Sequence, residues 1–155
     1  IGGQAGDALT TGGRNVALGK SALTTEDTGG RNVAIGWSAL GTLNFDGNGN
    51  NTALGYYAGA LIQTGINNTI VGNLAGDALT TGSNNIVIGS SAAASAVDVD
   101  NEITLGDSNI SAIRAQVTSI SSLSDKLQAS YGRLIPILVK AIQELSEEVK
   151  QLKNK

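Results

Sequence analysis

The chain has 155 residues, a formal net charge of −3 and 41% hydrophobic residues, with no Cys, His or Met. It therefore forms no disulfide bond, and it lacks the basic stripe with interleaved aromatics that nucleic-acid binding needs. No stretch approaches the roughly 18 apolar residues of a membrane span. Without His, Cys or a recurring carboxylate pair, we expect neither an enzyme nor a cofactor or metal site.

A glycine recurs at a nearly constant step through the first two-thirds of the chain. The intervals are 17, 17, 19, 17, 17 and 17 residues, and each glycine ends a short apolar run such as RNVALG or NNTIVG. The recurring positions are Gly2, Gly19, Gly36, Gly55, Gly72, Gly89 and Gly106. We expect backbone turns at Gly19 and its successors, because glycine accepts a positive φ. A fixed period of this kind predicts a repeat protein in which each unit packs on its neighbours.

Composition changes sharply at the end of these repeats. Of the 21 glycines, 20 lie in residues 1–106 and only Gly132 lies beyond. We therefore expect repeats over 1–106, a mostly extended junction over 107–130 and a terminal helix over 131–155. The opening Ile1-Gly2 pair looks like the tail of a further repeat, so we expect the true N-terminus to be missing.

Each repeat contains one short strand. In RNVALG, Val16 and Leu18 point one way while Asn15 and Ala17 point the other, an alternation that predicts a half-buried strand. A second short strand or loop follows, as in SALTT. One such unit has too thin a core to stand alone, so neighbouring units or neighbouring chains must cover it. Whether each chain coils by itself or three chains intertwine stays open at this point.

Asparagine precedes the apolar run in six repeats. We assign Asn15, Asn32, Asn51, Asn68, Asn85 and Asn101 to this place. One interpretation is a stacked amide ladder, and the other is left-handed turn geometry, which asparagine tolerates. The two interpretations are compatible.

One repeat has two extra residues and contains the string FDGNGN at 45–50. Asp46, Asn48 and Asn50 alternate like the start of a calcium loop. However, Asn51 stands where that loop needs glycine, and no glutamate follows at the required distance. We predict a surface loop without a metal, and a solvated loop for DVDNE at 98–102.

Three aromatic residues stand just after the repeat glycines. Trp37, Tyr56 and Tyr57 stand where other repeats carry small or polar residues, so we expect this position to be exposed. Exposed aromatics here are either contacts for a receptor or glycan or the cover of an apolar seam between subunits.

The last segment has a heptad pattern. Apolar residues recur at alternating steps of 4 and 3, which predicts a coiled-coil helix that begins near 134–136. The expected seam consists of Tyr131, Ile135, Leu138, Ile142, Leu145, Val149 and Leu152. Branched residues at the first heptad position favour two strands, whereas apolar residues such as Val139 widen the face and favour three.

The segments NEITLGDSNISAIRAQVTSISSLSDK (101–126) and YGRLIPILVKAIQELSEEVKQL (131–152) resemble the C-terminal intramolecular chaperone of bacteriophage tail fibres and tailspikes, the endosialidase type. The NTALGYYAG-type units are similar to shaft repeats of such fibres. The resemblance implies a homotrimer and a self-cleavage junction at Ser124-Asp125. Because the body of the chaperone domain is absent here, we expect that junction to be inactive. The repeats also resemble the NxVAxG units of trimeric autotransporter adhesin heads.

These observations predict an elongated homotrimer with an all-β repeat shaft, of the trimeric β-solenoid or β-prism type, closed by a C-terminal α-helical coiled coil. The function we expect is that of a structural fibre shaft, located in a virion tail fibre or an extracellular fibre. The alternative is an adhesin-type head that binds host glycan or matrix. The expected partners are further copies of the chain and a host receptor or glycan, with neither nucleic acid nor membrane insertion.

Overall fold

The computed structural model describes residues 1–113, 139–147 and 149–152. The chain divides into two compact units, Ile1–Ala112 and Ile113–Lys155. The first is a parallel β-solenoid, and the described part of the second is a short helix. An all-β repeat region followed by a helical segment is therefore confirmed.

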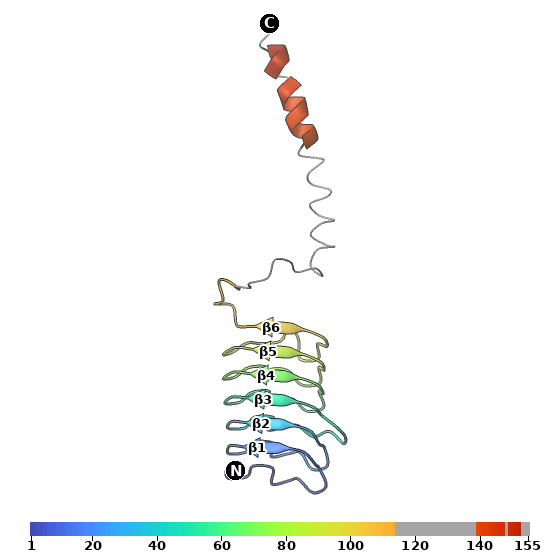
Figure 1. Cartoon of the computed structure of the whole chain (residues 1–155), viewed down its shortest axis with the longest axis vertical. Coiled ribbons are helices and arrows are strands. Elements are labelled where there is room, and N and C mark those ends of the chain that lie inside the picture. The colour runs from blue at the N-terminus through green and yellow to red at the C-terminus, as the bar shows by residue number, and fades with distance from the viewer. Residues whose placement is uncertain (114–138, 148, 153–155) are drawn as a thin grey trace. The chain divides into compact units, whose positions relative to one another are not determined.

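Six strands of three residues form a single sheet in chain order (Figure 1). Every neighbouring pair is parallel and in register, so that Ala17 lies beside Ala34 and Ala34 beside Ala53. The strands are β1 (Val16–Leu18), β2 (Val33–Ile35), β3 (Thr52–Leu54), β4 (Thr69–Val71), β5 (Ile86–Ile88) and β6 (Ile103–Leu105). Because strands of one chain pair with each other, the chain coils by itself and does not need to intertwine with others.

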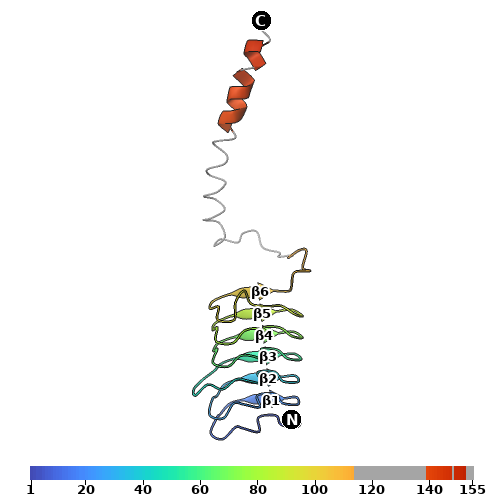
Figure 2. The ribbon, with the colours of Figure 1, turned by 180° about the vertical axis from the view of Figure 1, so that it is seen from behind.

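Turns, and no second strand, return the chain from one strand to the next. The SALTT and DALTT segments form turns that hydrogen-bond from coil to coil, as where the Leu23 N–H donates to the Ala39 carbonyl at 3.0 Å. Seen from both sides, the coils stack with closely similar outlines (Figures 1 and 2). The longer loop between β2 and β3 protrudes beyond the others. Its two additional residues are thus accommodated without disturbing the register of the sheet.

The glycine that ends each strand lies in a tight corner. Gly36 and Gly55 have φ values of 133° and 142°, which L-residues rarely adopt. A Cβ built on Gly36 would lie 2.1 Å from the Gly55 carbonyl oxygen. Positive φ recurs at Gly19, Gly72, Gly89 and Gly106, as a turn requires. The glycine spacing in the sequence therefore equals the length of one coil, because each coil needs one such corner.

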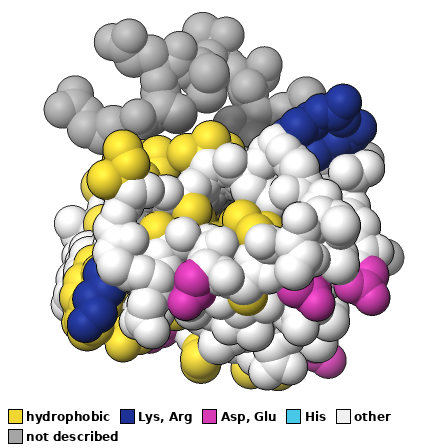
Figure 3. All heavy atoms as spheres, turned by 90° about the horizontal axis from the view of Figure 1, so that it is seen from below, with side chains coloured by type: hydrophobic (Ala, Val, Ile, Leu, Met, Phe, Trp, Pro, Cys, Tyr) yellow, Lys and Arg dark blue, Asp and Glu magenta, His cyan; other side chains and the backbone are white. Residues whose placement is uncertain are grey.

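The core is a narrow column of small and medium apolar side chains. Its members include Ala34, Ala53, Ile70 and Val87 from the centres of the strands, all fully buried. Leucines and isoleucines from the turns fill the other side of the column: Leu23, Leu40, Leu43, Ile62 and Leu79. Viewed from its N-terminal end, the solenoid shows hydrophobic side chains near its middle, with charged ones on the rim (Figure 3). One chain thus buries the inward residue of β2 to β5 fully and leaves the inward residues of β1 and β6 half-buried.

A carboxylate occupies one place in this apolar column. Glu26 comes seven residues after its repeat glycine, as Leu43 and Leu79 do in their coils, and it is fully buried. Its two carboxylate oxygens accept the N–H of Gly29 at 2.7 Å and the N–H of Phe45 at 3.2 Å. Glu26 thus links its own turn to the start of the longer loop. The sequence analysis missed this residue, although its distance from the repeat glycine marks it.

Asparagines form a hydrogen-bonded ladder on the inner side of the strands. The Oδ1 of Asn51 accepts the N–H of Asn68, and the Oδ1 of Asn68 accepts the N–H of Asn85, both at 2.9 Å. The Nδ2 of Asn68 also donates to the Gly82 carbonyl at 2.9 Å. The members are Asn15, Asn32, Asn51, Asn68 and Asn85. None of them has the positive φ of a turn asparagine, so the amide ladder is the correct interpretation here.

The assignment of Asn101 to this row is wrong. Glu102 takes the sixth place, where its N–H donates to the Asn85 Oδ1 at 2.8 Å, and Asn101 precedes it with φ at 61°. Hydrogen bonds from the Ser95 hydroxyl, the Ser95 N–H and the Thr104 hydroxyl lower the pKa of Glu102. The left-handed place before the ladder holds Arg14, Arg31, Asn50, Asn67, Asn84 and Asn101.

Substituting alanine for Asn68 should destabilise the solenoid strongly. The change leaves the Asn85 N–H and the Gly82 carbonyl buried without their partners. We expect the free energy of unfolding, measured by urea denaturation, to fall by about 2–4 kcal/mol. The exposed Asn73→Ala is the matched control and should change it by less than about 0.5 kcal/mol. Equal effects of the two variants would contradict the ladder.

The helix of the second unit covers residues 139–147 and 149–152. Two exposed salt bridges lie on this helix. The Lys140 Nζ lies 3.9 Å from the Glu144 Oε1, and the Lys150 Nζ lies 3.6 Å from the Glu147 Oε2. The expected start near 134–136 lies outside the described residues, as does the junction from 114 onwards. In the described part of the junction, the Asp107 carbonyl accepts the Ile110 N–H in a turn, so residues 107–110 are not extended.

Candidate interaction surface

The strands point two of their three side chains away from the core. Each strand has three residues, and only the middle one faces inward, so the first and third face outward. We call these twelve residues the outer sheet face. Its first column is Val16, Val33, Thr52, Thr69, Ile86 and Ile103, and its second is Leu18, Ile35, Leu54, Val71, Ile88 and Leu105.

The outer sheet face is continuous and accessible along the whole sheet. Ten of its twelve residues are Val, Leu or Ile, and the other two are threonines. Exposure reaches 67% at Ile103 and 47% at Leu54, while Val33, Ile35 and Val71 are half-buried. Parallel sheets are normally covered on both faces, and large exposed apolar patches mark interaction sites. This face therefore has the character of an interface.

Three aromatic rings cluster at the corner that follows β2 and β3. The ring centroids of Trp37, Tyr56 and Tyr57 lie 4.8–5.0 Å from one another. Trp37 is 39% exposed and Tyr56 is 44% exposed. The equivalent Lys20, Asn73 and Ser90 are also exposed, so the expected exposure is confirmed for Trp37 and Tyr56, whereas Tyr57 is half-buried. Trp37 and Tyr56 share one repeat position and Tyr57 takes the next, and the parallel stacking of coils brings the three rings together.

The irregular repeat forms an exposed loop against the neighbouring coil. Gly30 and Asn48 form a parallel bridge, and Asp46 accepts a hydrogen bond from the Thr28 hydroxyl. The insertion breaks the side-chain pattern of the ladder, because the Nδ2 of Asn32 is buried without a hydrogen-bond partner. Within the described ranges, no group of three or more His, Asp or Glu side chains is placed to hold a metal ion.

The described helix exposes its apolar seam. Ile142, Leu145, Val149 and Leu152 are 46–72% exposed, and Val139, outside the expected seam, is 47% exposed. The other expected seam residues, Tyr131, Ile135 and Leu138, and the junction residues Ser124 and Asp125 lie outside the described residues. The part of the chain that the structure describes contains no helix with the length and apolar character to cross a membrane.

No protein-family model, no curated protein and no solved structure matches this chain. The class of this protein is therefore described by its architecture alone, which is a parallel β-solenoid with one exposed apolar sheet face.

Proposed function

We propose that the chain is a segment of a homotrimeric fibre shaft, of the kind found in phage tail fibres or other extracellular fibres. The observation that carries the proposal is the outer sheet face. Its ten aliphatic residues leave water when copies of the chain pack side by side, and burying one such side chain contributes about 1.5–3 kcal/mol. Further copies of the chain fit best, because the face repeats along every coil and so matches another copy in register.

The apolar surface of the helix favours a three-stranded coiled coil over a two-stranded one. Its seam residues are exposed in the single chain, as are the seam positions of any coiled coil before association. Val139 extends the apolar surface beyond the narrow seam that a two-stranded coil would bury. The resemblance of 101–126 and 131–152 to phage fibre chaperones also implies a trimer.

In this proposal the function is mechanical. Each coil lengthens a rod by about 4.8 Å, the spacing of paired strands, and the rod carries a contacting tip away from its base. Native mass spectrometry of the full chain tests the proposal. We expect three times the chain mass of 15.6 kDa. A stable, well-folded monomer at micromolar concentration would contradict it.

An adhesin head that binds a host glycan is the second candidate, and the aromatic cluster favours it. Sugar rings stack on exposed aromatic faces, which Trp37 and Tyr56 provide. In that case Trp37→Ala should abolish binding on a glycan array without changing the melting temperature. In the shaft proposal the same change should lower the melting temperature or the trimer fraction.

A further inference from the structure

A small polar pocket lies beside the loop that the two-residue insertion creates. Its volume is about 260 Å³, and it is lined by Gly13, Arg14, Thr28, Gly30, Gly47 and Asn48. The Gly30 N–H donates to the Gly47 carbonyl at 2.8 Å, and the Gly49 N–H donates to the Gly30 carbonyl at 3.0 Å. Backbone hydrogen bonds thus fix the two walls of the pocket to each other.

The pocket is lined by backbone and by three polar side chains. Three of its six residues are glycines, and the others are Arg14, Thr28 and Asn48. A Cβ on Gly13 would meet no atom within 4 Å, so the space beside it is open. With neither aliphatic nor aromatic side chains in its lining, the pocket suits a hydrophilic ligand.

Arg14 brings a positive charge to the lining of the pocket. It has φ at 63°, in the left-handed place where later coils use asparagine, a residue that tolerates this geometry far better. No ion pair involves Arg14 in the part of the chain that the structure describes. Its guanidinium is thus available to a ligand.

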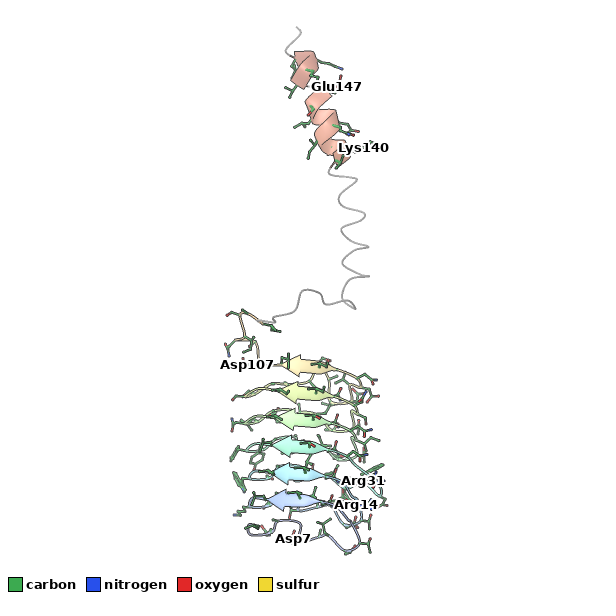
Figure 4. The ribbon with its side chains drawn as sticks, in the orientation of Figure 1. Asp7, Arg14, Arg31, Asp107, Lys140 and Glu147 are labelled. Atoms are coloured by element: carbon green, nitrogen blue, oxygen red, sulfur yellow. The ribbon has the colours of Figure 1, made fainter. Side chains whose placement is uncertain are left out.

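A second arginine occupies the same place one coil further on. Arg14 and Arg31 precede β1 and β2 and lie one above the other at the same side of the sheet (Figure 4). They are two of the three basic residues in residues 1–106, a region with eight acidic ones. Positive charge in this acidic region is therefore concentrated beside the pocket.

We propose that this pocket binds a small hydroxylated carboxylate, the chemistry of an acidic sugar residue. A planar guanidinium pairs with a carboxylate through two parallel hydrogen bonds. The Thr28 hydroxyl donates to Asp46, so its oxygen still accepts a bond from a ligand hydroxyl. The Asn48 amide both donates and accepts. Asp46 accepts the Thr28 hydroxyl at one end of the site, so the ligand carboxylate is favoured only at the Arg14 end, with the ligand hydroxyls toward Thr28 and Asn48.

Ligand-observed NMR on the full chain tests the proposal with three probes: glucuronate, glucose and acetate. We expect glucuronate to bind with a dissociation constant of about 1 mM or below, which is a weak affinity suited to one exposed pocket. Glucose, which lacks the carboxylate, and acetate, which lacks the hydroxyls, should each bind at least tenfold more weakly.

Matched variants locate the binding. Arg14→Asn introduces the residue that later coils carry at this place, so the fold should be retained while glucuronate binding falls at least tenfold. Lys20→Asn removes the third basic charge of residues 1–106 at an exposed position outside the lining of the pocket, and should change binding less than threefold. Gly13→Leu should block the pocket, whereas Gly3→Leu, also in open space, should not.

Three results would overturn the proposal: glucuronate binding no more tightly than glucose, acetate competing as strongly as glucuronate, or Arg14→Asn binding like the unsubstituted chain. The pocket belongs to one chain, since all its residues lie within 13–48. The proposal therefore goes beyond the fibre function and does not depend on it, and a monomer that binds glucuronate would contradict only the fibre.

Discussion

Replacing Leu54 by aspartate should convert the proposed trimer into monomers. Leu54 lies on β3, in the middle of the outer sheet face, and its side chain is 47% exposed in the single chain. In a trimer with that face buried, the variant would place a carboxylate from each copy in an apolar interface. Burying an unpaired charge costs several kcal/mol. The three carboxylates, which the symmetry of the trimer would bring to equivalent places, would also repel one another.

The measurement is sedimentation equilibrium at micromolar concentration, where the mass should fall from three chains to one chain of 15.6 kDa. Circular dichroism should show the solenoid retained, because the substituted side chain points away from the core of its own chain. Thr64→Asp adds the same charge at an exposed residue of the loop between β3 and β4, and it should leave the trimer intact. Full trimer formation by Leu54→Asp would show that the outer sheet face is not the interface.

Replacing Gly55 by alanine should have the largest effect on folding. Gly55 has φ at 142°, and an added Cβ would lie 2.2 Å from the Gly72 carbonyl oxygen. The alanine must therefore adopt an unfavourable backbone conformation and also push the next coil away. We expect a loss of about 3 kcal/mol or more in the free energy of unfolding.

Gly13→Ala is the matched control, because its Cβ would meet no atom within 4 Å and its φ is not in the left-handed region. Urea denaturation followed by circular dichroism should give a much lower midpoint for Gly55→Ala and a nearly unchanged one for Gly13→Ala. If both variants unfolded at the same urea concentration, the close stacking of the glycine corners would be refuted.

The positions of the strands could be predicted because their pattern is local. An apolar run of three residues ends at a glycine in each repeat, and the strands lie at these runs. The exposure of the position held by Trp37 and Tyr56 was also predictable, because other repeats carry Lys20 or Asn73 there. A repeated position samples the same environment several times, so its tolerated residues report that environment.

Which side of the strand faces inward could not be predicted in the same way. Alternation separates Val16 and Leu18 from Asn15 and Ala17, but hydrophobicity alone would bury the larger pair. The structure buries Ala34 and Ala53 and exposes Leu54, while Ile70 and Val87 are buried in the same inward place, so the direction in which the coil closes, and not side-chain size, fixes the inward side. The burial of Glu26 follows from the same stacking, which places its carboxylate beside two backbone N–H groups.

The sequence by itself determined the period, the glycine corners, the short strands and the apolar seam of the helix, since each depends on neighbouring residues and on their spacing. Only the tertiary structure decided that each chain coils on its own, that asparagines form an inner ladder, and that the first and third residues of each strand face outward. These features depend on contacts between residues 17 or 19 positions apart. Such contacts exist only once successive coils have stacked, because parallel pairing fixes which side chains meet.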